Sequence, residues 1–302
     1  MQWLKKGLIY GANDNNWWMN NSALQPTPIV IGDVIRIFVG FRDAKGVGRV
    51  GYVDVDAENP SQIIKVQETP CLDIGGPGCF DDNGVVPCAV TQVGEKLYLF
   101  YAGYNIGYHV RMTIFSGLAI SDDQGENFRR VSNVPVMERT HNETLFRVIH
   151  TALYDNGEWK MYYGAGNKFI QGKNKTLPVY EIELLQTKQI SDMRRDGTIL
   201  LKNEGDEYRI GRPYVIKDGG IYKMFFCKGT EKITYRLAYA ESPDGISWER
   251  KDDKLNLALS EEGWDSEMMA YPAFVKYKDK AYLFYNGNNY GYEGFGYAEL
   301  MK

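Results

Sequence analysis

The segment PYVIKDGGIYKMFFCKG, residues 213–229, has four close variants elsewhere in this 302-residue chain. Every copy begins at an anchor, which is proline in four copies and His150 in the third, and continues with an apolar run, a polar turn and an aromatic run. Successive anchors are 61, 63, 63 and 59 residues apart. The other copies are PTPIVIGDVIRIFVGF (26–41), PCAVTQVGEKLYLFYAG (87–103), HTALYDNGEWKMYYGAG (150–166) and PAFVKYKDKAYLFYNG (272–287).

Each copy predicts two antiparallel strands, because a polar turn separates two runs rich in Val, Ile, Tyr and Phe. Two further strands follow in the best-preserved copies, GLAISDDQGENFRRV (117–131) and RLAYAESPDGISWERK (236–251), on either side of a tight Asp/Gly turn. Four short strands at this period predict one propeller blade. We therefore expect an all-β, five-bladed β-propeller with four-stranded antiparallel blades, filling residues 1–302 as a single domain, with a short helix only at 185–195.

The two ends of the chain predict how the ring closes. The last copy stops after its third strand, GFGYAEL (294–300), so its blade lacks one strand. The N-terminal sequence Trp3-Leu4-Lys5-Lys6 resembles the fourth strand of the fourth copy, Trp248-Glu249-Arg250-Lys251. We expect residues 3–10 to complete the last blade and close the ring, which leaves no unpaired strand edge there.

Composition excludes several classes of function. Lys plus Arg is 35 and Asp plus Glu is 39, so the net charge of −4 offers no general attraction to nucleic acid or to an anionic membrane. No apolar stretch has the length of a membrane span or a signal peptide, and we expect a cytoplasmic protein. Four cysteines and three histidines lack the spacings of metal sites, so no metal or cofactor is expected. The oligomeric state is left open.

Polar residues gather just before the anchors. In a propeller the innermost strands line a central channel, so these positions should converge on one mouth. Carboxylates accept hydrogen bonds from sugar hydroxyls and aromatic rings cover the apolar faces of sugars, which favours a carbohydrate ligand in this funnel. The predicted catalytic residues are Asp82, Glu207 and Glu267, and the predicted substrate-binding residues are Asp81, Glu143, Arg147, His150, Arg212, Trp264, Asp265 and Tyr271.

Structural roles for the same residues stay open at this point. Acids that precede a strand could cap turns at a solvated rim. Arg147 and Arg212 could neutralise carboxylates of neighbouring blades, since buried ions are normally paired. His150 could simply occupy a proline position.

The five-copy pattern, the Ser-x-Asp-Gly-x-x-Trp hairpin at 242–248 and the segment FDDNGVVPCAV (80–90) resemble the five-bladed propeller superfamily of arabinanases, invertases, levansucrases and related mannoside phosphorylases. Three other segments are similar to an uncharacterised branch of that superfamily from bacterial polysaccharide gene clusters. They are GRPYVIKDGGIYKMFF (211–226), YRLAYAESPDGISWER (235–250) and GWDSEMMAYPAFV (263–275). The resemblance covers essentially the whole chain and implies chemistry on glycosidic bonds.

The resemblance also implies three acids at inner-strand starts, and this sequence departs from that pattern. It has Gln25, Ile149 and Gly211-Arg212 at those places. One hypothesis is a glycoside hydrolase or transferase, in which one carboxylic acid protonates the leaving oxygen and another activates water or attacks the anomeric carbon. Phosphorolysis, with arginines holding the phosphate nucleophile, is a variant of it. The alternative is a non-catalytic carbohydrate-binding propeller that has lost the acid triad.

Overall fold

The structure is a computed structural model that describes residues 1–11, 16–191 and 193–301. Its described residues form strands β1 to β20 and two helical turns, α1 (Asp252–Leu255) and α2 (Asn288–Gly291). The prediction of a helix at 185–195 is wrong, because residues 185–187 end strand β12, where Leu184 and Leu185 are buried in the core. Within the described part of the chain, no helix has the length and apolarity needed to cross a lipid bilayer.

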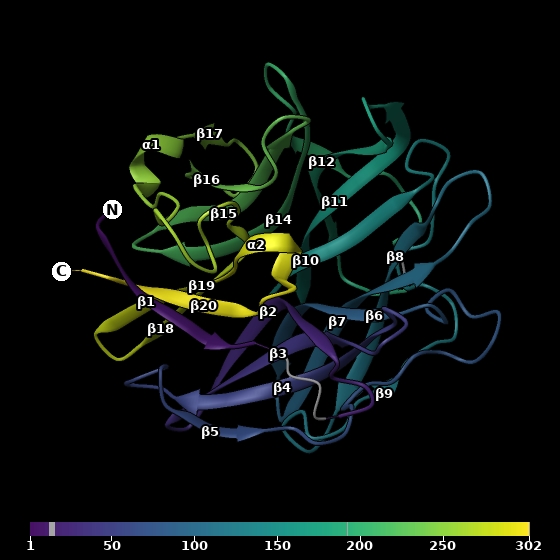
Figure 1. The fold of residues 1–302 in the computed structure, drawn as a ribbon. Coiled ribbons are helices and arrows are strands. Elements are labelled where there is room, and N and C mark those ends of the chain that lie inside the picture. Colours follow the sequence, from purple (N-terminus) through teal and green to yellow (C-terminus); the bar gives the residue numbers. More distant parts are fainter. Residues whose placement is uncertain (12–15, 192, 302) are drawn as a thin grey trace.

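Two four-stranded antiparallel sheets lie next to one another, although they come from opposite ends of the sequence (Figure 1). One contains the first repeat and the other contains the last repeat together with the N-terminal strand. In order across the sheets, the strands are β2 (Asn21–Ile31), β3 (Val34–Arg42), β4 (Gly48–Asp56) and β5 (Ile63–Val66), and then β1 (Trp3–Tyr10), β20 (Phe295–Leu300), β19 (Lys280–Asn286) and β18 (Ala270–Tyr277).

The middle three repeats form one twelve-stranded sheet of three antiparallel groups. Brief parallel contacts, β8 with β10 and β12 with β14, join the groups. The groups are β6 (Val85–Val93), β7 (Lys96–Asn105), β8 (Thr113–Ser121) and β9 (Arg129–Arg130); β10 (Phe146–Asp155), β11 (Glu158–Gln171), β12 (Thr176–Thr187) and β13 (Thr198–Leu201); and β14 (Glu207–Asp218), β15 (Ile221–Thr230), β16 (Arg236–Ser242) and β17 (Glu249–Arg250).

The N-terminal strand pairs with the C-terminal strand, as the sequence predicts. β1 runs antiparallel to β20, with Trp3 opposite Leu300 and Tyr10 opposite Phe295. The ladder of backbone pairing nevertheless stops between the sheets, so the described strands form no continuous ladder around the molecule. At these junctions, packed side chains hold neighbouring sheets together.

Five large hydrophobic clusters form most of the core, and each joins strands of two successive repeats. The cluster that joins the last repeat to the first contains Ile37 and Val53 from β3 and β4 together with Tyr282 and Phe284 from β19. Burial of these apolar faces holds the repeats together, at roughly 25 cal/mol for each Å² removed from water. The other clusters pack Phe38 with Leu99, Phe100 with Met161, Tyr162 with Met224, and Phe225 with Phe274.

Candidate functional site

All five repeats contribute to one cavity of about 380 Å³, which we call the central cavity. Gln25 of β2, Ala102 of β7, His150 of β10, Arg212 of β14 and Tyr271 of β18 are among the residues that line it. This volume falls in the range of small-molecule sites, roughly 300–1,000 Å³. The inner-strand starts of four repeats therefore point to the same place, and the second repeat reaches it through β7 instead of its inner strand β6.

A bulge lies beside each anchor, and in four of the five repeats a residue at or before the anchor lines the cavity. The pairing of every inner strand with the next strand slips at the anchor, for example between Gly211 and Tyr214. In three repeats the residue before the anchor proline has a left-handed φ, 54° at Gln25, 56° at Arg212 and 56° at Tyr271. Residues before proline normally adopt extended φ, and left-handed φ is costly for non-glycine residues. Strained positions of this kind cluster at functional sites.

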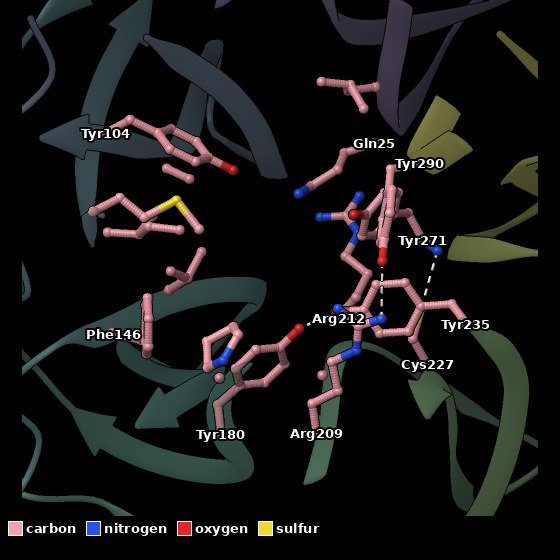
Figure 2. A pocket seen from close by; sticks show the side chains of 18 of the residues that line it. Gln25, Tyr104, Phe146, Tyr180, Arg209, Arg212, Cys227, Tyr235, Tyr271 and Tyr290 are labelled. Atoms are coloured by element: carbon pink, nitrogen blue, oxygen red, sulfur yellow. Dashed lines mark hydrogen bonds between the residues drawn. The ribbon is translucent and has the colours of Figure 1, made fainter. Parts of the chain in front are cut away.

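The lining of the central cavity is rich in cations and tyrosines and, among the described residues, contains no carboxylate. The cations run from the exposed rim, Arg111 and Lys175, to the buried interior, Arg209 and Arg212. Figure 2 shows Tyr104 and Phe146 on one wall and the Arg209–Tyr290 pair across from them. The five cations are Arg42, Arg111, Lys175, Arg209 and Arg212, and the six tyrosines are Tyr104, Tyr180, Tyr208, Tyr235, Tyr271 and Tyr290.

Arg212 forms part of the floor of the cavity and ties several repeats together. Its guanidinium donates to the carbonyl oxygens of Cys88 and Pro26 and to Thr27 Oγ1. It also lies 3.4 Å from His150 Nδ1, which must accept because arginine can only donate. The proton of neutral His150 is therefore on Nε2. Burial, reinforced by Arg212, lowers the pKa of His150 well below its ordinary value, so the ring is neutral at physiological pH.

Three of the predicted acids lie outside the lining of the cavity, because each is held by a tyrosine twenty residues later in the chain. Tyr101 donates to Asp81 at 3.0 Å, Tyr163 to Glu143 at 2.9 Å, and Tyr285 to Asp265 at 2.9 Å. A cation completes each cluster: Arg130 lies 2.8 Å from Asp81, Arg147 lies 2.5 Å from Glu143, and Lys5 lies 2.7 Å from Asp265.

The other predicted acids are also away from the lining. Glu207 forms a two-pronged pair with Arg250, at 2.9 and 3.0 Å. Asp82 accepts from the backbone N–H of Gly78 and from Asn83 Nδ2, and so caps a turn. Glu267 is exposed, and its backbone N–H donates to Asn288 Oδ1.

The expectation that carboxylates converge on the funnel therefore needs correction. Of the eleven predicted site residues, only His150, Arg212 and Tyr271 line the central cavity. Asp81, Asp82, Glu143, Glu207, Asp265 and Glu267 are held at the turns and packed junctions through which the chain enters the inner strands. Arg147 is fully buried in the Glu143 cluster and Trp264 stacks on Tyr285 with centroids 5.0 Å apart. Whether any of these acids acts on a substrate stays a prediction.

Most of the tyrosines and cations of the cavity were missed. Arg209 lies three residues before Arg212 on the same inner strand, so a longer count back from the anchor would have included it. Arg42 and Tyr104 end second strands, which run antiparallel to the inner strands and therefore finish beside the inner-strand starts. This pairing was the signal that could have identified them.

Comparisons with known proteins agree with this architecture. Residues 74–196 match the family model described as the glycosyl hydrolases family 32 N-terminal domain. Over 302 residues, the chain is 30% identical to the uncharacterized protein Rv1502 of Mycobacterium tuberculosis (strain ATCC 25618 / H37Rv), with 99% of both chains covered.

Solved structures share the fold at lower sequence identity. One glycoside hydrolase superimposes with a TM-score of 0.74 at 19% identity, covering 99% of this chain and 93% of that one. A thermostable family-43 glycoside hydrolase superimposes with a TM-score of 0.70 at 14% identity, covering 96% and 91%.

Proposed function

This chain belongs to the β-propeller glycoside hydrolases, and from that premise we propose that its central cavity binds a carbohydrate. The observation that carries the proposal is the lining itself, which combines six tyrosines with hydrogen-bond donors from every repeat. Tyrosine rings can cover the apolar faces of a sugar, while guanidinium, imidazole and phenol groups bond its oxygens.

Binding without carboxylate catalysis is the mode that this geometry supports best. The usual mechanism of glycoside hydrolysis needs two carboxyl groups beside the scissile bond, roughly 5–9.5 Å apart. The lining of the central cavity has none in the part of the chain that the structure describes. This supports the non-catalytic carbohydrate-binding alternative that the sequence leaves open.

Cleavage of a glycosidic bond is the second candidate, and family membership favours it. In this version Asp82 and Glu207 serve as acid and base or nucleophile, and Glu267 modulates them. The charge partner of Glu207 is Arg250, in place of Arg212, which the sequence suggested. Phosphorolysis belongs to the same candidate, because arginines suit an oxyanion nucleophile.

We also infer that the five repeats are the five blades of one propeller domain spanning the chain. Five clusters that each join successive repeats, including the last with the first, support this inference, as does the pairing of β1 with β20.

One experiment separates the two modes of action. Calorimetry with a saccharide panel measures binding by the wild type, by Tyr104→Ala in the cavity, and by the control Tyr154→Ala, a half-exposed tyrosine outside the lining. The same panel as aryl glycosides, with and without inorganic phosphate, measures turnover by the wild type, Asp82→Asn and Glu207→Gln.

Binding that Tyr104→Ala weakens and Tyr154→Ala leaves intact, with no turnover, supports the binding function. Turnover that falls roughly a hundredfold to ten-thousandfold in either acid variant, with folding intact, would establish the cleavage candidate instead. If no saccharide binds and none is turned over, the carbohydrate proposal is wrong.

A further inference from the structure

The positive charge of the central cavity is not balanced within the described chain. Elsewhere in the protein, buried arginines are matched with carboxylates: Arg36 with Asp54 at 2.8 Å, Arg49 with Asp43 at 2.9 Å, and Arg147 with Glu143 at 2.5 Å. Arg209 and Arg212 are equally buried, at 7% and 2% exposure, and neither has an acidic partner among the described residues. A buried charge without a counter-ion is costly, so these two positions depart from how the rest of the fold treats its arginines.

The two buried arginines differ in what they could still bind. Arg212 directs both of its terminal nitrogens at the carbonyl groups of Cys88 and Pro26 and at Thr27, and only its buried Nε has no hydrogen-bond partner among the described residues. Arg209 makes one hydrogen bond, from Nη2 to the hydroxyl of Tyr290 at 3.1 Å. Its Nε and Nη1 have no hydrogen-bond partner among the described residues. Arg209 thus has a terminal nitrogen, Nη1, left for a ligand, whereas both terminal nitrogens of Arg212 are already bonded.

Tyrosines hold Arg209 in one position. The guanidinium lies 3.9 Å from the ring centroid of Tyr235 and 4.9 Å from that of Tyr208, in cation–π geometry. Tyr235 is fixed in turn by a hydrogen bond between its hydroxyl and that of Tyr180 (Figure 2). A side chain held before the ligand arrives loses little entropy on binding, which favours affinity.

Gly229 makes room for this arrangement on the neighbouring strand β15. A Cβ atom at Gly229 would lie 2.9 Å from Arg209 Nε and 2.5 Å from the carbonyl oxygen of Thr234. Any larger residue would push the guanidinium away from its tyrosines. The backbone of the neighbouring strand, as well as the tyrosines, therefore fits this position of Arg209.

We propose that the carbohydrate bound in the central cavity is acidic, and that Arg209 contacts its anionic group. The inference rests on the proposed function and specifies its ligand class: a sugar that carries a carboxylate, sulfate or phosphate. The planar guanidinium matches the paired oxygens of all three groups. Arg42, Arg111 and Lys175 supply further positive charge at the mouth and rim and draw such a ligand in, although the whole chain has a net charge of −4.

The test compares matched probes by calorimetry: glucose, glucuronate, glucose 6-sulfate and glucose 6-phosphate, followed by neutral and uronate-containing oligosaccharides. Proteins are the wild type, Arg209→Met, Arg209→Lys, and Arg129→Met as a control at an exposed arginine outside the lining. Thermal melting checks that each variant folds. Free acetate, sulfate and phosphate form a separate arm.

At least one acidic probe should bind tenfold or more tightly than its neutral counterpart, and more weakly as salt rises. Arg209→Met should weaken that binding roughly 10- to 100-fold. Arg209→Lys should retain part of it, because the charge stays but the two-pronged geometry is lost. Arg129→Met should bind like the wild type. The probe that binds best shows whether the anionic group of the ligand is a carboxylate, a sulfate or a phosphate.

Other outcomes refute either the acidic ligand or the carbohydrate, and they can be told apart. Equal binding of neutral and acidic sugars, unchanged in Arg209→Met, refutes the acidic ligand but leaves carbohydrate binding standing. Binding of free anions through Arg209, with no saccharide bound, refutes the carbohydrate and retains the anion site. If no probe of either kind binds, both proposals fall.

Discussion

Arg212 Nη2 lies 3.1 Å from the carbonyl oxygen of Pro26, 186 residues earlier in the chain. The same side chain donates to the carbonyl oxygen of Cys88 and faces His150, so the fourth repeat is bonded to the first three at the floor of the cavity. A guanidinium can do this because its planar donors point in several directions at once. Arg212 stands where the resemblance implies an acid, and in this chain it bonds several inner strands to one another.

Replacing Arg212 should therefore destabilise the fold. Arg212→Met leaves four buried acceptors without this donor, and we expect the free energy of unfolding to fall by about 2–3 kcal/mol. Arg212→Lys should recover only part of the loss, since an ammonium cannot reach all the acceptors together. Urea denaturation measures both variants against Arg42→Met, a half-exposed cation of the same lining. An Arg212→Met protein that unfolds at the same urea concentration as the wild type would contradict this role.

Asp81 should matter for stability and not for ligand binding. Its carboxylate is fully buried between Tyr101 and Arg130, so Asp81→Asn removes the charge that Arg130 pairs with. We expect a loss of roughly 3 kcal/mol, whereas Asp122→Asn, which breaks an exposed pair with Lys96, should change stability by less than about 1 kcal/mol. Thermal melts and saccharide calorimetry on both variants test this. If a stable, folded Asp81→Asn protein no longer binds saccharide, Asp81 takes part in ligand binding and the prediction is wrong.

The strands were predictable because their information is local. Each hairpin carries its own apolar runs and turn. Five copies in register made the repeat recognisable, although the third copy has His150 in place of the anchor proline. The pairing of β1 with β20 was predictable for a related reason, since Trp3 and its neighbours resemble the fourth strand of another copy. The helix at 185–195 failed because β12 runs on into that segment.

The site was predictable only in part, because it depends on how side chains are turned. Arg212 and Tyr271 were identified from their position before a proline, and a bulge with left-handed φ aims them inward. The acids sit close by in sequence, but tyrosines on the next strand hold them away from the cavity. The regular spacing of those tyrosines, such as Tyr163 twenty residues after Glu143, is present in the sequence and gains meaning only once the strands are paired.

Removing residues 1–10 should destabilise the protein and promote aggregation. The deletion uncovers the edge of β20, and it also removes Lys5 from buried Asp265 and Trp3 from Phe274. An exposed strand edge is a template for pairing with other chains. We expect the melting temperature to fall by many degrees and light scattering to rise on heating.

A milder variant separates the edge from the ion pair. Lys5→Met keeps β1 in place but leaves Asp265 without its cation, so it should lower stability without causing aggregation. A truncated protein that melts and remains monodisperse like the full chain would refute the structural role of β1.

Glu143 and Glu183 share one hydroxyl group. Tyr163 Oη lies 2.9 Å from Glu143 Oε2 and 3.0 Å from Glu183 Oε2, yet it has a single proton to donate. Burial, together with the charge of Glu143, raises the pKa of Glu183 from 4.5 to about 7. The folded state therefore holds a proton that the unfolded chain releases near pH 4.5.

This proton makes stability depend on pH in a definite direction. A group whose pKa is raised by folding contributes stability below its unfolded pKa and loses it as pH rises through the folded pKa. The contribution of Glu183 should thus decline between about pH 4.5 and 7, by at most roughly 3 kcal/mol. Glu183→Gln keeps the neutral shape without a titrating proton, so its stability relative to the wild type should increase from pH 5 to about pH 7 and level off by pH 8. Urea denaturation across that range measures the difference, with Glu249→Gln, a side chain 74% exposed, as the control. A difference between Glu183→Gln and the wild type that stays constant with pH would show that Glu183 is ionised throughout the range.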